Sequence, residues 1–212
     1  MQVSYDGIRG VPPRAQDRRR ARGERTRRAL AEALINLLEE GDAQPTARRI
    51  AERAGVSLRL VFHHFDDLES ILRDAVRIQE HRHWRHIRPV DSSLPVDERV
   101  SGLVRQRSAV YQATAPVRRS AEHFTRTSPT VAAELARGRE WLRAQLQTTF
   151  APELEDRRPA DVRLLLDALE VTTSWETWEQ LVRLGRSTAA GRRTMEALTR
   201  AALSLAPTGG RP

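Results

Sequence analysis

The sequence predicts an all-α protein in which a long helix joins an N-terminal, three-helix helix-turn-helix head to a C-terminal helical bundle. Apolar residues recur at three- and four-residue spacing along most of the 212 residues, as they do on one face of a helix. No segment shows the sustained alternation typical of a strand, so we expect no sheet. Ser, Thr, Asp, Gly and Pro stand where this periodicity starts and stops, which indicates separate helices.

Residues 1–22 have little periodicity and contain two Gly and two Pro, so we predict a disordered arm. All 36 basic residues of the chain are Arg, and nine of them lie within residues 1–28 beside three acidic residues. Much of the net charge of +8 is therefore at the N-terminus. Such an arm suits contact with phosphate or insertion into a minor groove, and a solvated tail without specific contacts is the alternative.

The first helix is predicted over residues 24–40, where four Leu residues form an apolar stripe before Gly41. The long connecting helix follows the helix-turn-helix. It is predicted to begin at Asp66 or Asp67 and to run up to Pro89, because proline removes a backbone donor and ends a helix.

The segment IAERAGVSLRLVFHHF, residues 50–65, has the pattern of a helix-turn-helix. Ala51 is small enough to let two helices pack closely, and Gly55 can adopt the left-handed conformation that a tight turn requires. Thr46 and Ser57 are expected to cap the two short helices, which end near residues 53 and 64. The residues predicted to be buried on the inner side are Ile50, Val56 and Val61.

Further helices are predicted beyond a loop that contains Pro89 and Pro95. Pro116 is expected to break one of them, and Ser128 with Pro129 supplies a cap and a proline at the first helical position. The expected ranges are 96–115, 117–126, 128–150, 159–185 and 188–205.

The composition excludes several classes of protein. The chain has no Cys, so it has no disulfide or thiolate metal site, which fits a reducing cytoplasm. We find neither a signal peptide nor a run of about 18 apolar residues that would span a membrane. The sequence lacks a Gly-rich phosphate loop, a nucleophile elbow and a zinc-protease motif, so we expect no enzyme, no cofactor and no metal.

The order of the helices and the motifs within residues 25–72 resemble the TetR family of bacterial transcriptional regulators. Two segments carry most of the resemblance, TARRIAERAGVS at 46–57 and HHFDDLESIL at 63–72. The single positions that also match are Thr26, Ala33, Gly41, Phe65, Glu69 and Leu72.

The resemblance implies a ligand-responsive repressor that binds a palindromic double-stranded DNA operator as a homodimer. A small-molecule effector, not identified by the sequence, would release it. The implied parts are a basic arm over 1–22, a DNA-binding helix-turn-helix domain over 23–66, and a helical ligand-binding and dimerisation domain over 67–206.

Some positions depart from the usual family pattern after the turn, which reads Ser, any residue, Gly, Thr, Leu, Tyr, Tyr, His, Phe. Leu60 and Phe62 stand at the Thr and first Tyr positions, which removes two hydroxyls that would reach phosphate. Leu68 stands where Lys is common, whereas Arg59 replaces Gly and adds a cation. These departures alter the expected contacts and leave the expected fold unchanged.

The predicted DNA-binding residues are Thr46, Arg48, Ser57, Leu58, Arg59, Leu60, Phe62 and His63. Arg59 can bond O6 and N7 of guanine, and Leu58 or Leu60 can pack on a thymine methyl group. Thr46 and Arg48 begin the preceding helix, where side chains and free N–H groups face phosphate. The alternatives are a phosphate-only contact for Arg59, packing within the head for Leu58 and Leu60, and a core position for Phe62.

Two apolar stripes predict a four-helix dimer interface, with intramolecular core as the alternative. They are Val171, Trp175, Trp178 and Val182, and Met195, Leu198, Ala202 and Leu205. The aromatic residues predicted to line an effector pocket, again with ordinary core as the alternative, are Trp84, Tyr111, Phe124, Trp141, Trp175 and Trp178. Arg118, Arg119 and His123 face either solvent or an anionic group of the ligand.

Two other functions stay open at this point. An architectural, weakly specific DNA binder would rely on the Arg-rich arm and would tolerate the lost hydroxyls. A transcriptional activator would share every feature described above.

Overall fold

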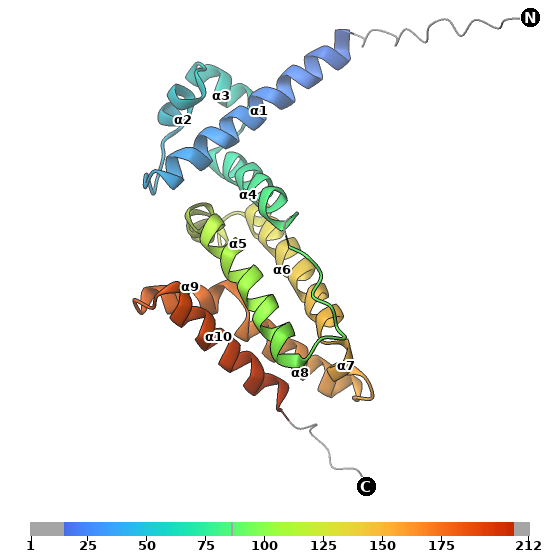
Figure 1. Ribbon diagram of the computed structural model, residues 1–212. Coiled ribbons are helices and arrows are strands. Elements are labelled where there is room, and N and C mark those ends of the chain that lie inside the picture. The colour runs from blue at the N-terminus through green and yellow to red at the C-terminus, as the bar shows by residue number, and fades with distance from the viewer. Residues whose placement is uncertain (1–14, 86, 206–212) are drawn as a thin grey trace, which may run out of the picture.

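The structure, a computed structural model, describes residues 15–85 and 87–205, and these contain helices, turns and loops but no strand. The helices are α1 (Ala15–Glu39), α2 (Ala47–Ala54), α3 (Leu58–His64), α4 (Leu68–Trp84), α5 (Val96–Phe124), α6 (Pro129–Thr149), α7 (Ala151–Leu154), α8 (Pro159–Thr172), α9 (Trp175–Arg183) and α10 (Thr188–Leu203). In Figure 1, α1, α2 and α3 form a head from which α4 leads to the bundle of later helices. The predicted all-α class is confirmed. No described helix is both long and apolar enough to cross a lipid bilayer.

The turn between α2 and α3 has the predicted geometry. Gly55 adopts the left-handed conformation with φ 68° and ψ 34°, and the Val56 N–H donates to the Ala51 carbonyl at 3.0 Å. The side-chain oxygens of Thr46 and Ser57 each accept a hydrogen bond from a backbone N–H of the first turn, at 3.3 and 3.2 Å. These local interactions fix the two helix starts and the bend between them.

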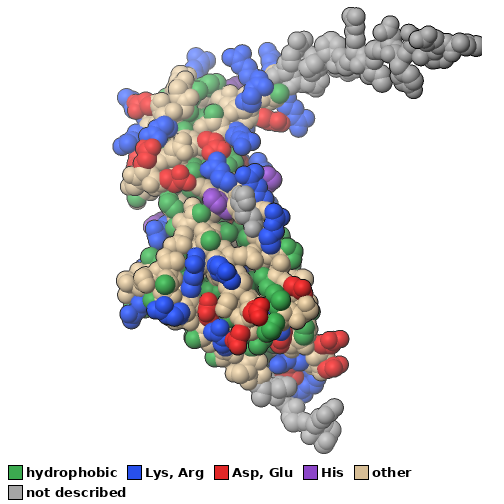
Figure 2. Space-filling view, in the orientation of Figure 1, with side chains coloured by type: hydrophobic (Ala, Val, Ile, Leu, Met, Phe, Trp, Pro, Cys, Tyr) green, Lys and Arg blue, Asp and Glu red, His purple; other side chains and the backbone are tan. Residues whose placement is uncertain are grey.

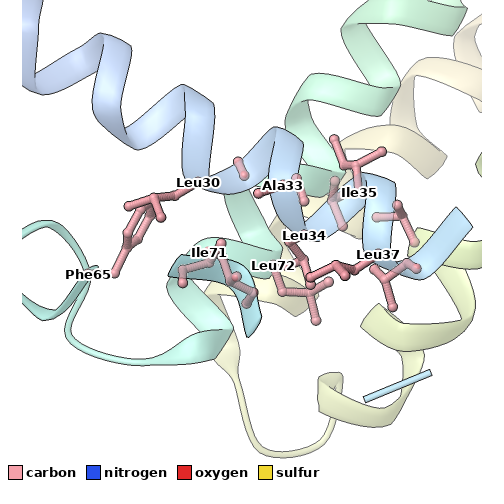
Figure 3. Close-up of a cluster of buried hydrophobic side chains, with 14 of the residues drawn as sticks. Leu30, Ala33, Leu34, Ile35, Leu37, Phe65, Ile71 and Leu72 are labelled. Atoms are coloured by element: carbon pink, nitrogen blue, oxygen red, sulfur yellow. The ribbon is translucent and has the colours of Figure 1, made fainter. Parts of the chain in front are cut away.

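The head has an apolar core that α1 shares with α2, α3 and α4 (Figure 3). Leu30, Ile50 and Val61 are each almost completely buried. The same core continues into the bundle, where its members are Val117 and Ala121 of α5 and Val131 and Leu135 of α6. The interior of the head is therefore completed by residues that lie far along the chain.

A second apolar core fills the bundle between α5, α6, α8, α9 and α10. Trp175, Trp178 and Phe150 are its largest members outside α5 and α6, and each is at most 2% exposed. α5 contributes to both cores and so joins the head to the bundle.

The first helix begins earlier than the sequence predicts. α1 starts at Ala15, so residues 15–22, predicted to be disordered, are helical, and residues 1–14 lie outside the described part. The Gly and Pro residues of the predicted arm all precede residue 14, whereas Ala, Gln and Arg, which favour helices, follow it. Helix propensity therefore outweighs the lack of an apolar stripe here.

The predicted helix break at Pro116 is wrong. α5 continues through Pro116 to Phe124. Ala115 packs in the core of the bundle and Val117 in the core of the head, so tertiary contacts hold the helix on both sides. This burial outweighs the cost of an interior proline, which is about 3 kcal/mol.

The single helix predicted over 159–185 is also wrong, because α8 and α9 are separate. The Thr173 hydroxyl donates to the Leu169 carbonyl at 2.6 Å, and the Ser174 side chain accepts from a backbone N–H of α9 at 3.0 Å. Successive side chains that bond the backbone offer it an alternative to continuing the helix. The sequence likewise misses the short α7 and extends α4 a few residues beyond its observed end at Trp84.

Candidate nucleic-acid interface and cavity

Helix α3 presents an apolar and basic outer face. Leu58, Arg59, Phe62 and His63 are exposed, whereas Val61 on the inner side is only 1% exposed. Leu58 and Phe62 are four residues apart, so their side chains lie on one face of the helix. Large apolar side chains that the head leaves uncovered are available for contact with another molecule.

The core position considered for Phe62 is wrong. Phe62 is 56% exposed, and Phe65 instead packs in the core of the head at 2% exposure. Leu60 is half-buried, so its side chain is neither fully packed within the head nor fully available to contact DNA. The half-buried His64 has a pKa below its ordinary value, because burial disfavours the charged ring and His63 and Arg27 add positive charge nearby.

The two Arg residues predicted to contact DNA have no carboxylate partner within the described ranges. Arg48 and Arg59 are exposed and form no ion pair there. In contrast, Arg49 lies 3.2 Å from Asp42, and Arg53 lies 2.5 Å from Glu40, whose pKa this hydrogen bond lowers. The charges of Arg48 and Arg59 are thus left for an external anion or acceptor.

Basic side chains also line the N-terminal half of α1, which extends beyond α3 (Figures 1 and 2). The exposed ones are Arg19, Arg20, Arg22, Arg25 and Arg28. A Cβ placed on Gly23 would lie 3.7 Å from the ring of His64, so α1 passes close to the end of α3 at this point. The sequence predicts this charge but assigns Arg19, Arg20 and Arg22 to a disordered arm and not to the helix that carries them.

A cavity of about 850 Å³ that is open to solvent lies between α5, α6, α8, α9 and α10. Of the six aromatic residues predicted for an effector pocket, the structure brings Tyr111 and Trp175 to this cavity. Their rings meet edge to face with centroids 5.9 Å apart, and the Tyr111 hydroxyl donates to the Thr173 carbonyl at 2.9 Å. A volume of this size is typical of small-molecule sites.

The other four aromatic residues lie elsewhere. Trp84 of α4 and Trp141 of α6 stack on each other with centroids 5.0 Å apart, which joins the connecting helix to the bundle. Trp178 is buried, and a Cβ on Gly191 would lie 3.1 Å from its ring. Phe124 packs against the core of the head.

Three polar residues that follow Pro116 have different surroundings. Arg118 lines the cavity, which agrees with the alternative in which it faces a ligand and not solvent. Arg119 instead forms two hydrogen bonds with the Glu179 carboxylate at 3.0 and 2.9 Å, and His123 is exposed.

The two predicted interface stripes are divided between the core and the surface. Trp175, Trp178, Met195 and Ala202 are buried within the chain. The apolar side chains that α8, α9, α10 and the adjoining residues leave exposed are Leu164, Val171, Val182, Leu184, Leu198 and Leu205.

An electrostatic feature that the sequence does not reveal lies between α4 and α6. Burial raises the pKa of Glu80 from 4.5 to about 7, and the nearby charge of Glu134 adds to this effect. A Cβ on Gly138 would lie 2.7 Å from Oε1 of Glu80, so the two helices meet closely here. No local signal marks such a site, because it depends on which acidic residues two distant helices bring together.

No protein-family model and no curated protein matches the sequence. Among solved structures, the chain is similar to the crystal structure of SCO3833, described as a member of the TetR transcriptional regulator family from Streptomyces coelicolor A3. The two chains share 22% sequence identity over 83% of this chain and 89% of that chain, with a TM-score of 0.47. A likeness at this level concerns the course of the chain and assigns no role to any residue.

Proposed function

We propose that the protein is a ligand-responsive transcriptional regulator whose helix α3 enters the major groove of DNA. The outer face of α3 carries the proposal. This face is exposed, it has the free cation of Arg59, and it is held by a capped start and a left-handed turn at Gly55. A short helix presented in this way fits the major groove, which is about 12 Å wide.

Arg59, Leu58 and Phe62 are the residues proposed to read bases. The Arg59 guanidinium can bond O6 and N7 of guanine, a contact worth about 1–3 kcal/mol of discrimination. Leu58 and Phe62 share the same exposed face and can contact thymine methyl groups. His63 and Ser57 lie beside this face and are proposed as backbone contacts.

Residues on α1 and α2 are proposed to hold the phosphate backbone. Thr46 and Arg48 are exposed at the start of α2, where backbone N–H groups also favour an anion. The exposed Arg residues of α1 extend this basic surface along one helix. Such contacts fix the register of the protein without reading sequence.

We propose that the protein acts as a homodimer, because one helix-turn-helix buries too little surface for tight specific binding. The exposed apolar side chains of this region that do not line the cavity, Leu164, Val182, Leu184 and Leu205, are proposed as the surface for a second copy. Two heads would then read half-sites about 34–36 Å apart in a near-palindromic operator.

The cavity is the proposed effector site, and repression released by the effector is the proposed mode of control. α5 lines the cavity with Tyr111 and Arg118 and packs in the core of the head with Val117. A ligand that favours a different position of α5 would therefore move the head and lower operator affinity.

Selection of binding sites from randomised duplexes by the full-length protein tests DNA recognition. We expect a near-palindromic site. We also expect Arg59→Gln to weaken binding about tenfold and to relax one guanine position. Arg53→Gln is the control, because Arg53 is paired with Glu40 and should change affinity less than about twofold. Failure to enrich any site, with binding that falls steeply with salt for all duplexes, would indicate an architectural binder instead.

Sedimentation at micromolar concentration tests the dimer. We expect a dimer for the natural chain and a folded monomer for Leu164→Glu, because the variant places a charge on the exposed face of α8. Leu94→Glu is the control, since Leu94 is similarly exposed but lies outside α8, α9 and α10. A monomeric natural chain would contradict the proposal.

A further inference from the structure

Three Arg residues line the cavity in the bundle, Arg107, Arg118 and Arg139, together with three acidic residues. Two acidic residues of its lining, Asp167 and Glu170, both pair with Arg143, whose single positive charge offsets one of their two negative charges. A third, Glu176, has a side chain that is 62% exposed to solvent. The lining thus holds equal numbers of Arg and acidic residues, and the hydrogen bonding of its two largely buried Arg residues, Arg107 and Arg118, distinguishes them from the rest.

Arg107 is a cation at the cavity with no acidic partner in contact. Arg107 is 1% exposed, and all the groups that accept its hydrogen bonds are neutral. They are the Thr173 hydroxyl and carbonyl, the Leu142 carbonyl and the Gln145 side chain. Burial lowers the pKa of its guanidinium, yet arginine stays charged in proteins. The wall thus holds a full positive charge whose hydrogen-bond acceptors are all neutral, and the carboxylate of Glu170 acts on it at longer range.

Arg118 lines the same cavity, and its hydrogen-bond donors are less fully satisfied than those of Arg107. Its side chain is 11% exposed, and its Nε is buried without a hydrogen-bond partner. Glu176 and Glu122 form ion pairs with Arg118, with 3.6 and 3.9 Å between nitrogen and oxygen, and both contacts are too long to be hydrogen bonds. A buried charged donor without an acceptor is costly, and its presence points to an acceptor that the protein does not supply.

The rest of the lining is largely aromatic and aliphatic. The guanidinium carbon of Arg118 lies 5.5 Å from the centre of the Trp175 ring, and Trp175 meets Tyr111 edge to face. The aliphatic members of the lining are Leu142, Val171, Leu181 and Leu198. An apolar body placed here would cover these side chains while leaving one polar group beside Arg118.

We propose that the cavity binds an organic acid whose carboxylate is held by Arg118 and whose apolar body packs against Trp175. The planar guanidinium matches a carboxylate through two parallel hydrogen bonds, and Arg107 adds positive charge behind it. This inference rests on the proposed function, since it names the chemical class of the effector for the same cavity.

The place of Arg118 on α5 explains how such a ligand would reach the head. Its neighbour Val117 is 1% exposed in the core of the head. The charge of Arg118 also lowers the pKa of Glu80 on α4, against the larger effects of burial and Glu134. A carboxylate bound at Arg118 would weaken this attraction and so act on both helices that join head and bundle.

Calorimetry with matched pairs of ligands tests the inference. The probes are 1-naphthaleneacetate with 1-naphthaleneacetamide, and 4-phenylbutyrate with 4-phenylbutyramide, in which only the charge of the head group differs. We expect each carboxylate to bind at least about tenfold more tightly than its amide, as a charge-assisted hydrogen bond predicts. Equal affinity within both pairs, or no binding of either carboxylate at millimolar concentration, would overturn it.

Two variants locate the effect within the cavity. Arg118→Gln should abolish the preference for the carboxylate while leaving the affinity of the amide within about twofold. Arg119→Gln should keep the preference, because Arg119 pairs with Glu179 and does not line the cavity. A preference that survives Arg118→Gln would also overturn the assignment.

Operator binding measured on the same preparations separates this inference from the proposed function. Operator binding without a preference for carboxylates leaves the DNA-binding proposal standing and removes the ligand class. A carboxylate preference in a protein that selects no DNA site supports the organic-acid site and removes the regulator.

Discussion

The guanidinium of Arg27 on α1 donates a hydrogen bond to the buried Asp74 carboxylate on α4, with 2.9 Å between Nη2 and Oδ2. Its Nη1 donates to the His64 carbonyl at the end of α3, at 2.6 Å, and the group lies 4.2 Å from the centre of the Phe65 ring. One side chain therefore links the three helices that set the position of the recognition helix. In the sequence, Arg27 is only one of nine Arg residues within residues 1–28.

Replacement of Arg27 by Met should lower the free energy of unfolding by about 1–3 kcal/mol, because Asp74 would stay buried with Arg73 as its remaining partner. Operator affinity should fall as well, since α3 loses its attachment. Urea unfolding followed by circular dichroism measures the first effect. Arg28→Met should change stability by less than about 0.5 kcal/mol, because its contact with Glu32 is long and exposed. Equal losses for both variants would refute the linking role.

Gly55→Ala should destabilise the protein by about 1–2 kcal/mol. No atom lies within 4 Å of a Cβ at this position, so the cost comes from the left-handed backbone and not from a clash. Gly102→Ala should instead be neutral or stabilising, because Gly102 is inside α5 and its Cβ would make ordinary contact with Val90 at 3.7 Å. Thermal unfolding of the pair compares the two. A stable Gly55→Ala variant would show that the turn can adopt another conformation.

Phe62→Ala and Val61→Ala should affect different properties, the first mainly operator affinity and the second mainly stability. Phe62→Ala removes an exposed side chain, so stability should change by less than about 0.5 kcal/mol while operator affinity falls. Val61→Ala opens a space in the head core and should cost about 1–3 kcal/mol of stability. Unfolding and fluorescence anisotropy on both variants give the comparison. A large loss of stability in Phe62→Ala would mean that its ring packs within the protein.

The raised pKa of Glu80 predicts a pH-dependent stability. Between about pH 4.5 and 7 the unfolded chain has released this proton while the folded chain keeps it, so the free energy of unfolding falls as pH rises. The fall is at most about 1.4 kcal/mol per pH unit. Glu134 and Arg137 on α6 and Arg118 on α5 are the charged groups that also act on this carboxyl.

Glu80→Gln should remove that contribution. The difference in unfolding free energy between natural chain and variant should decline from pH 4.5 to 7 and stay constant above it. Denaturant titrations at fixed ionic strength measure this difference, with Glu140→Gln on the exposed side of α6 as the control. A difference that does not vary with pH would show that Glu80 ionises as an ordinary carboxyl.

The helix-turn-helix was the part most open to sequence-based prediction, because its determinants are local. Thr46, Ser57 and Gly55 each act on backbone groups within four residues, and all three have the predicted geometry. The outer face of α3 follows from the same local pattern once Val61 is placed inside. The exposure of Phe62 does not, since a large apolar residue is more often buried.

Features that depend on distant segments were not predictable. Pro116 stays helical because two separate cores hold α5, and Thr173 ends α8 although the apolar pattern continues. The aromatic residues of the bundle are divided by tertiary packing, so composition alone does not tell Trp175 beside the cavity from Trp84 in a stacked pair. The unsatisfied Nε of Arg118 likewise appears only when its neighbours are known.

The sharing of the head core with α5 and α6 has a consequence for protein engineering. Recombinant fusions that graft residues 1–84 onto a foreign sensor would leave part of the head core uncovered, because Val117, Ala121, Val131 and Leu135 would be missing. Such chimaeras should aggregate unless the matching turns of α5 and α6 are transplanted with them. A transferable unit of this protein is therefore defined by the residues that share a packed core and not by one continuous stretch of sequence.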